Sequence, residues 1–126
     1  MAARWTAARS ATDAGHRVSL HNDGVCSPTD PLSGVATAIS RRAHPSGPVH
    51  GPAERLTLDE ALCAVTVHPA WQLHPEHEIG MLRTGMRADL TVLTTDPRRV
   101  SPDAFRAEVR VTATYLGGRP THTPER

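Results

Sequence analysis

Eleven prolines are spread along this chain of 126 residues and divide it into short segments. Proline fixes φ and has no backbone N–H, so it interrupts helices and the interior of sheets. This spacing argues against a plain helical bundle. Hydrophobic residues make up 38% of the sequence and aromatic residues only 3%. The composition therefore predicts one modest domain with an aliphatic, alanine-rich core.

The first two thirds of the chain predict helices and one short strand. Apolar spacing indicates helices over 2–14 and 32–43, with Asp30-Pro31 as the cap and first turn of the second. Val18 to His21 alternates apolar and polar side chains, which indicates a strand. Thr57 and Glu60 form a capping box before an apolar run, so a helix begins there, and 70–74 is expected to form a further short helix.

The last third predicts a small β unit. Leu90 to Leu93 is expected to be a strand that ends before Asp96-Pro97. The alternating run from Val109 to Tyr115 reaches Gly117-Gly118 and is expected to return as a hairpin. Helices and a strand followed by further strands indicate an α/β unit joined to a β unit.

Charge, cysteine content and hydropathy exclude several classes of protein. The net charge is +1 and the basic residues are dispersed, so no nucleic-acid partner is expected. No apolar run approaches the roughly 20 residues of a membrane span, so no membrane partner is expected. The two cysteines lack CxxC spacing, which favours a reduced, cytoplasmic setting.

An imidazole, an amide and a carboxylate follow the predicted strand in the run His21-Asn22-Asp23-Gly24. One interpretation is a tight turn, because Asn, Asp and Gly tolerate left-handed backbone. The other is a catalytic strand end at which the carboxylate of Asp23 is used. These four residues alone leave both interpretations open.

Four separated stretches together resemble the C-terminal part of a metal-dependent amidohydrolase, in the branch similar to N-substituted formamide deformylases. They are "SLHNDGVCSPTDPL", "GPAERLTLDEALCAVTVHPAWQL", "HEIGMLRTGMRADLTVLTTDP" and "VRVTATYLGGRP". The likeness runs from about Arg17 to His122 in family order. It implies an α/β fold, the C-terminal fragment of a (β/α)8 barrel followed by strands of a small β-sandwich. Residues 1–78 would be the last barrel strand and its helices, and 79–126 the sandwich strands.

The resemblance also implies a chemistry and a role for Asp23. The family hydrolyses C–N bonds other than peptide bonds, such as amides, imides or N-formyl groups, with water activated by zinc or another divalent ion. Asp23 matches the aspartate that binds the metal and serves as general base and acid. His21 is a weaker neighbour that would contact the substrate or orient Asp23. The family's other metal ligands, including its His-x-His pair, have no counterpart in this chain.

Because a complete barrel takes roughly 250 residues, the chain is expected to be catalytically incomplete by itself. Its expected partners are a small-molecule substrate and either the missing N-terminal barrel portion or further copies of the chain. Two alternatives stay open: a catalytically inactive truncated remnant, and a small protein-binding domain.

Other polar residues are interpreted structurally. Cys26 is expected to be a small loop or buried residue and not a nucleophile. His74 and His77 are expected to be exposed loop histidines, with Pro75 between them. Asp89 is expected to close a turn by accepting hydrogen bonds from backbone amides.

Overall fold

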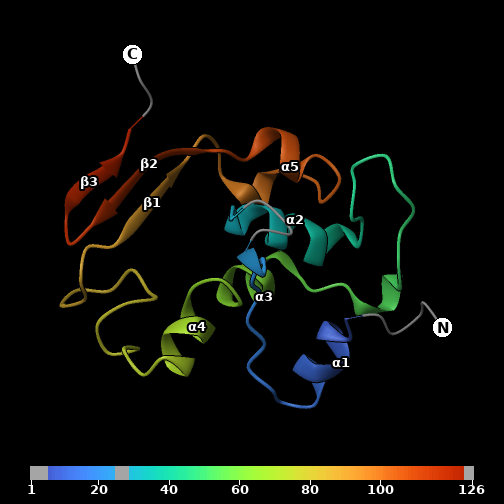
Figure 1. Ribbon diagram of the computed structural model, residues 1–126, viewed down its shortest axis with the longest axis horizontal. Coiled ribbons are helices and arrows are strands. Elements are labelled where there is room, and N and C mark those ends of the chain that lie inside the picture. The colour runs from blue at the N-terminus through green and yellow to red at the C-terminus, as the bar shows by residue number, and fades with distance from the viewer. Residues whose placement is uncertain (1–5, 25–28, 124–126) are drawn as a thin grey trace.

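The computed structural model describes residues 6–24 and 29–123. Figure 1 shows a cluster of short helices with an antiparallel sheet extending to one side of it. The helices are α1 (Ala8–Asp13), α2 (Pro31–Ser40), η3 (Pro52–Glu54), α3 (Leu58–Cys63), α4 (Val67–Gln72), η4 (Pro97–Arg99) and α5 (Phe105–Glu108). The strands are β1 (Leu90–Leu93), β2 (Val111–Leu116) and β3 (Arg119–His122).

The beginning of α2 confirms the predicted cap. The Asp30 side chain accepts a hydrogen bond from the amide of Leu32 at 3.0 Å, and Pro31 occupies the first turn. The helix ends at Ser40, three residues before the predicted end, because Arg41 adopts left-handed backbone with φ 60°. The buried guanidinium of Arg41 donates to the carbonyl oxygens of His50 and Thr6, contacts between distant residues that fix this end.

The capping box predicted for α3 is present and also holds α1. Glu60 accepts from the amide and hydroxyl of Thr57, both at 2.8 Å, and from the Arg9 guanidinium of α1 at 2.6 Å. The hydrogen bond from Arg9 is the largest of the effects that lower the pKa of Glu60 from 4.5 to about 2. Buried Glu54 makes a second link to α1, where it accepts from the amide and hydroxyl of Ser10.

The core lies between α2, α3 and α5. Val35 and Phe105 are completely buried, and Ile39, Leu56 and Ala61 pack in the same cluster. This one cluster therefore combines residues of 1–78 with Phe105 and Val109 of 79–126. Helix α5 was not predicted from the sequence, yet its Phe105 is the largest fully buried side chain among the described residues.

The sheet confirms the predicted β unit. Its strands pair in the order β1-β2-β3, all antiparallel, and Gly117-Gly118 forms the predicted turn. Asp89 accepts from the amide of Gly117 at 2.7 Å and from Arg87 Nε at 2.8 Å, and these contacts, the one with Arg87 first, lower its pKa. Asp89 thus closes the turn, as predicted.

The predicted strand from Val18 to His21 is not formed, since residues 16–23 carry no helix or strand. A β-strand needs a neighbouring strand as hydrogen-bonding partner. Here the backbone groups of Val18 and Leu20 bond instead to residues of the helical part of the chain. The amide of Leu20 donates to the carbonyl of Ala64 at 3.0 Å. The ring Nδ1 of His68 donates to the carbonyl of Val18 at 2.7 Å, so this histidine has a structural role.

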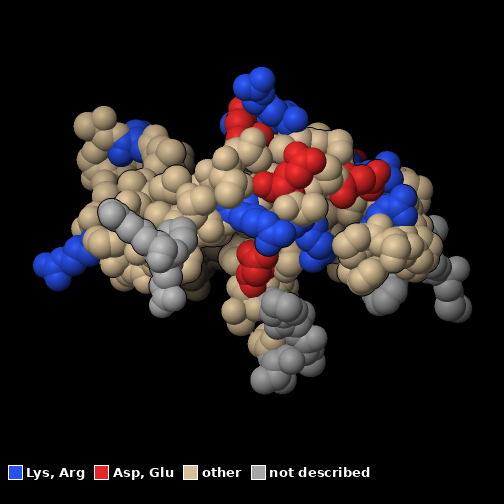
Figure 2. Space-filling view, turned by 90° about the horizontal axis from the view of Figure 1, so that it is seen from above, with Lys and Arg blue, Asp and Glu red and all other residues tan. Residues whose placement is uncertain are grey.

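Acidic and basic side chains lie beside one another in the middle and right of the face in Figure 2. Ion pairs between distant segments include Arg98 with Asp59 at 2.9 Å and Arg42 with Asp103 at 3.2 Å. Within the described residues, no helix has both the length and the apolar character needed to cross a membrane.

Candidate functional site

Asp23 lies at the end of the irregular segment 16–23. Its backbone is left-handed with φ 58°, and Gly24 follows with φ 72°. Aspartate is one of the few residues other than glycine that adopt this conformation readily. Asp23 and Gly24 thus form a bend of two left-handed residues, and the Asp23 side chain is exposed there.

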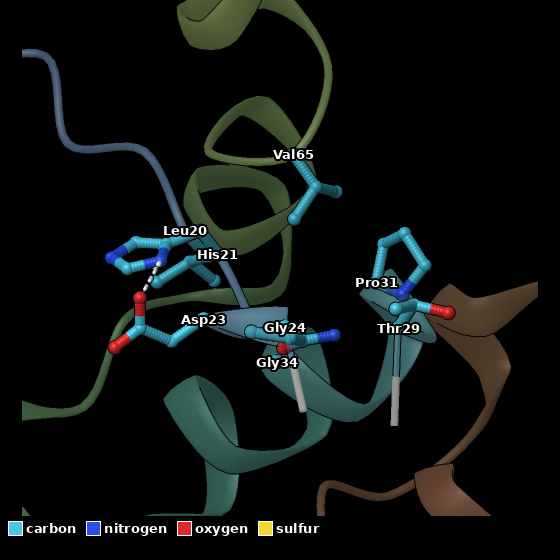
Figure 3. Close-up of a pocket in the computed structure, with 9 residues that line it drawn as sticks. Leu20, His21, Asp23, Gly24, Thr29, Pro31, Gly34 and Val65 are labelled. Carbon is cyan, nitrogen blue, oxygen red and sulfur yellow. Dashed lines mark ion pairs between the residues drawn. The ribbon is translucent and has the colours of Figure 1, made fainter. Parts of the chain in front are cut away.

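The carboxylate of Asp23 faces the ring of His21. Asp23 Oδ1 and His21 Nδ1 are 3.9 Å apart, the ion pair drawn as a dashed line in Figure 3. Both side chains are highly exposed, at 86% and 77%. The two predicted site residues therefore lie together, and both remain open to a ligand or to a second protein surface.

The bend is anchored to the beginning of α2. Asn22 donates from Nδ2 to the carbonyl of Asp30 at 3.0 Å, and the hydroxyl of Ser33 donates to the same oxygen at 2.7 Å. Because Asp30 also caps α2, the helix fixes the position of the residue next to Asp23. These hydrogen bonds anchor the bend, while the Asp23 side chain itself is exposed.

A cavity of about 230 Å³ opens beside Asp23. Its lining comes from the bend, from α2 and from the turn after α3. Its described lining residues are Leu20, His21, Asn22, Asp23, Gly24, Thr29, Pro31, Gly34 and Val65. In Figure 3 the His21–Asp23 pair lies on one side and Thr29 and Pro31 on the other. Asp23 is therefore not enclosed in a local turn without an opening.

Gly34 and Val65 are cavity residues that the sequence analysis did not identify. A Cβ added at Gly34 would lie 3.7 Å from Leu20 Cβ and 3.8 Å from Asn22 Oδ1, so the missing side chain leaves room at the bend. A glycine inside an apolar helical pattern costs about 1 kcal/mol relative to alanine. A glycine retained despite that cost is the sequence signal that could have indicated a close approach of another segment to α2 at Gly34. Val65 carried no comparable signal.

The described residues contain no complete set of three side-chain ligands for a metal ion. No group of three His, Cys, Asp or Glu side chains within 6–24 and 29–123 is arranged as a metal site. A catalytic zinc ion usually takes three protein ligands, whereas this bend offers one carboxylate and one imidazole. Cys26 lies outside the described residues.

A model of the amidohydrolase family matches residues 1–122. The chain is 38% identical over 110 residues to an N-substituted formamide deformylase of Arthrobacter pascens, covering 87% of this chain and 20% of the relative. It is 32% identical over 104 residues to Protein LONG AFTER FAR-RED 3 of Arabidopsis thaliana, covering 81% of this chain and 17% of the relative. It is 32% identical over 83 residues to the putative amidohydrolase YtcJ of Bacillus subtilis (strain 168), covering 64% of this chain and 16% of the relative.

The chain therefore spans a fifth or less of the length of these curated relatives. No solved structure matches it.

Proposed function

Because the chain belongs to the amidohydrolase family, we propose that it forms the C-terminal end of a metal-dependent hydrolase acting on a non-peptide C–N bond. The observation that carries the proposal is the exposed carboxylate of Asp23, held at an anchored bend beside an open cavity. A carboxylate in that position is open to water, to substrate and to a neighbouring part of the enzyme.

The reaction is the hydrolysis of an amide, imide or N-formyl group. Water adds through its oxygen to the carbonyl carbon, the C–N bond breaks, and the products are a carboxylic acid and an amine or an amide. Asp23 takes a proton from the attacking water and returns it to the departing nitrogen, which is a poor leaving group until it is protonated. His21, 3.9 Å away, orients the carboxylate or contacts the substrate.

The proposal assigns a divalent ion, zinc or a metal of similar chemistry, to the complete site. Asp23 would be one ligand. The remaining ligands come from the portion of the enzyme outside this chain, because the described residues cannot complete the set. Residues 1–78 would then belong to the end of the (β/α)8 barrel and 79–126 to its β-sandwich. The helices and the three-stranded antiparallel sheet are consistent with such a fragment.

The test is a chimera in which this chain replaces the matching portion of the Arthrobacter pascens deformylase. We expect it to release amine from an N-substituted formamide. Asp23→Asn should lower kcat by about 10²- to 10⁴-fold, the range contributed by a positioned general acid–base group. Asp59→Asn is the matched control, because Asp59 is an exposed carboxylate that pairs with Arg98 and does not line the cavity. Equal activity in the two variants would refute the role of Asp23.

A further inference from the structure

The walls of the cavity beside Asp23 are apolar, whereas its rim is polar. Its walls are mostly apolar, with Leu20 from the bend, Pro31 from the first turn of α2 and Val65 from the turn after α3. The rim carries the carboxylate of Asp23 and the ring of His21. A ligand that matches both surfaces has an apolar end and, next to it, a polar or cationic end.

The size of the cavity limits that apolar end. Sites that enclose a drug-sized ligand measure about 300–1,000 Å³. The volume here is about 230 Å³, and the cavity is open to solvent. The described walls therefore surround the volume of one short substituent, and the rest of a substrate would lie outside them.

Gly34 lines the cavity on the α2 side. The nearest atoms to a Cβ at this position are those of Leu20 and Asn22, at 3.7–3.9 Å, which is ordinary van der Waals contact. An alanine would fit, whereas a branched side chain would extend toward Leu20 and occupy the space. A larger side chain at position 34 would therefore reduce the space beside Leu20.

We propose that this cavity binds the short apolar substituent on the nitrogen of the substrate, and that Gly34 is a specificity-determining residue. The amine product binds in the same way, with its ammonium group at the carboxylate of Asp23 and its alkyl chain against Leu20 and Val65. Charge complementarity supports this occupant, because an ammonium is attracted to the rim carboxylate while the walls favour hydrocarbon. The inference rests on the proposed function, since that function makes the substituted nitrogen the group that meets Asp23.

The experiment is a titration of the ¹⁵N-labelled full chain, followed by amide chemical shifts, with three probes of equal length. Butylammonium has both the alkyl chain and the charge, methoxyethylammonium has the charge with an ether chain, and butanol has the chain without the charge. We expect butylammonium to shift the amides of Leu20, Gly34 and Val65 at the lowest concentration. Methoxyethylammonium should bind least, because its ether oxygen loses hydration against apolar walls.

Variants separate the two ends of the site. Asp23→Asn should weaken butylammonium about two- to five-fold, the range expected for one exposed ion pair, and leave butanol unchanged. Glu108→Gln, which removes an exposed carboxylate on α5, is the control and should change neither. Gly34→Val should abolish the shifts at Leu20 and Val65. Val65→Thr, of nearly equal volume, tests the apolar wall without filling the cavity and should weaken butylammonium and butanol together.

The proposal is overturned if the three probes give equal shifts, or if the shifts fall outside the cavity. It is also overturned if both Gly34→Val and Val65→Thr bind butylammonium as the unmodified chain does. Absence of dispersed signals for Leu20, Gly34 and Val65 would equally overturn it, because the chain would then lack the cavity. No metal ion or turnover is needed in this titration, so its failure is distinct from failure of the hydrolase assignment.

Discussion

Replacing Glu60 by glutamine tests the contact that joins α1 to α3. Glu60 accepts three hydrogen bonds, one from Arg9 and two from Thr57. Its pKa of about 2 in the folded chain lies well below its ordinary 4.5. One pKa unit corresponds to about 1.4 kcal/mol, so the full shift would stabilise the folded state by about 3 kcal/mol.

The expected effect is about half that value. The Glu60 side chain is 31% exposed, and solvent screens the interaction with Arg9. We therefore expect Glu60→Gln to lower the free energy of unfolding by about 1.5 kcal/mol at pH 7. A carboxylate whose pKa is lowered by folding stabilises the protein above its unfolded pKa and loses that contribution as pH falls through the folded pKa. The difference between the two proteins should therefore shrink from about pH 5 and nearly vanish near pH 2.

Urea unfolding, followed by circular dichroism from pH 7 to pH 2, measures this difference. Glu108→Gln is the control for loss of an exposed carboxylate and should stay within about 0.5 kcal/mol of the unmodified chain. A Glu60→Gln destabilisation that is the same at pH 7 and pH 2 would refute the reasoning, because it would show that packing and not charge is responsible.

Three further predictions concern the core and the turns. Phe105→Ala should lower the free energy of unfolding by about 3–5 kcal/mol, measured by urea unfolding, because it removes a fully buried aromatic ring. Gly80→Ala should destabilise more than Gly85→Ala, by about 1–3 kcal/mol. Both glycines have positive φ, but only at Gly80 would the new methyl group meet a neighbouring side-chain carbon at 2.8 Å, and equal losses would contradict this. Asp89→Ala should speed hydrogen exchange of the Gly117 amide by about fivefold or more, which corresponds to the net value of one hydrogen bond. An unchanged rate would contradict the hydrogen bond from Gly117 to Asp89.

Local signals in the sequence predicted the elements whose causes are local. The capping box of Thr57 and Glu60 needs residues only three positions apart, and the Asp30 cap needs two. The hairpin follows from alternation and paired glycines. In each case the partners are near in sequence, so the pattern is visible without the fold.

Features that depend on residues far apart in the sequence could not be predicted from local patterns. The end of α2 is set by buried Arg41, whose contacts lie up to 35 positions away. The expected strand from Val18 to His21 is replaced by contacts with the carbonyl of Ala64 and the ring of His68. At the site, the sequence placed His21 and Asp23 together, but the cavity wall formed by Gly34 and Val65 needed the fold.

The metal content of the chimera tests most directly whether Asp23 faces a divalent ion. After dialysis against metal-free buffer, the chimera carrying the unmodified chain should retain zinc. Asp23→Ala should lose it, and Asp59→Ala should keep it, because only the first substitution removes a ligand. Zinc retained by Asp23→Ala at the level of the unmodified chimera would contradict the account.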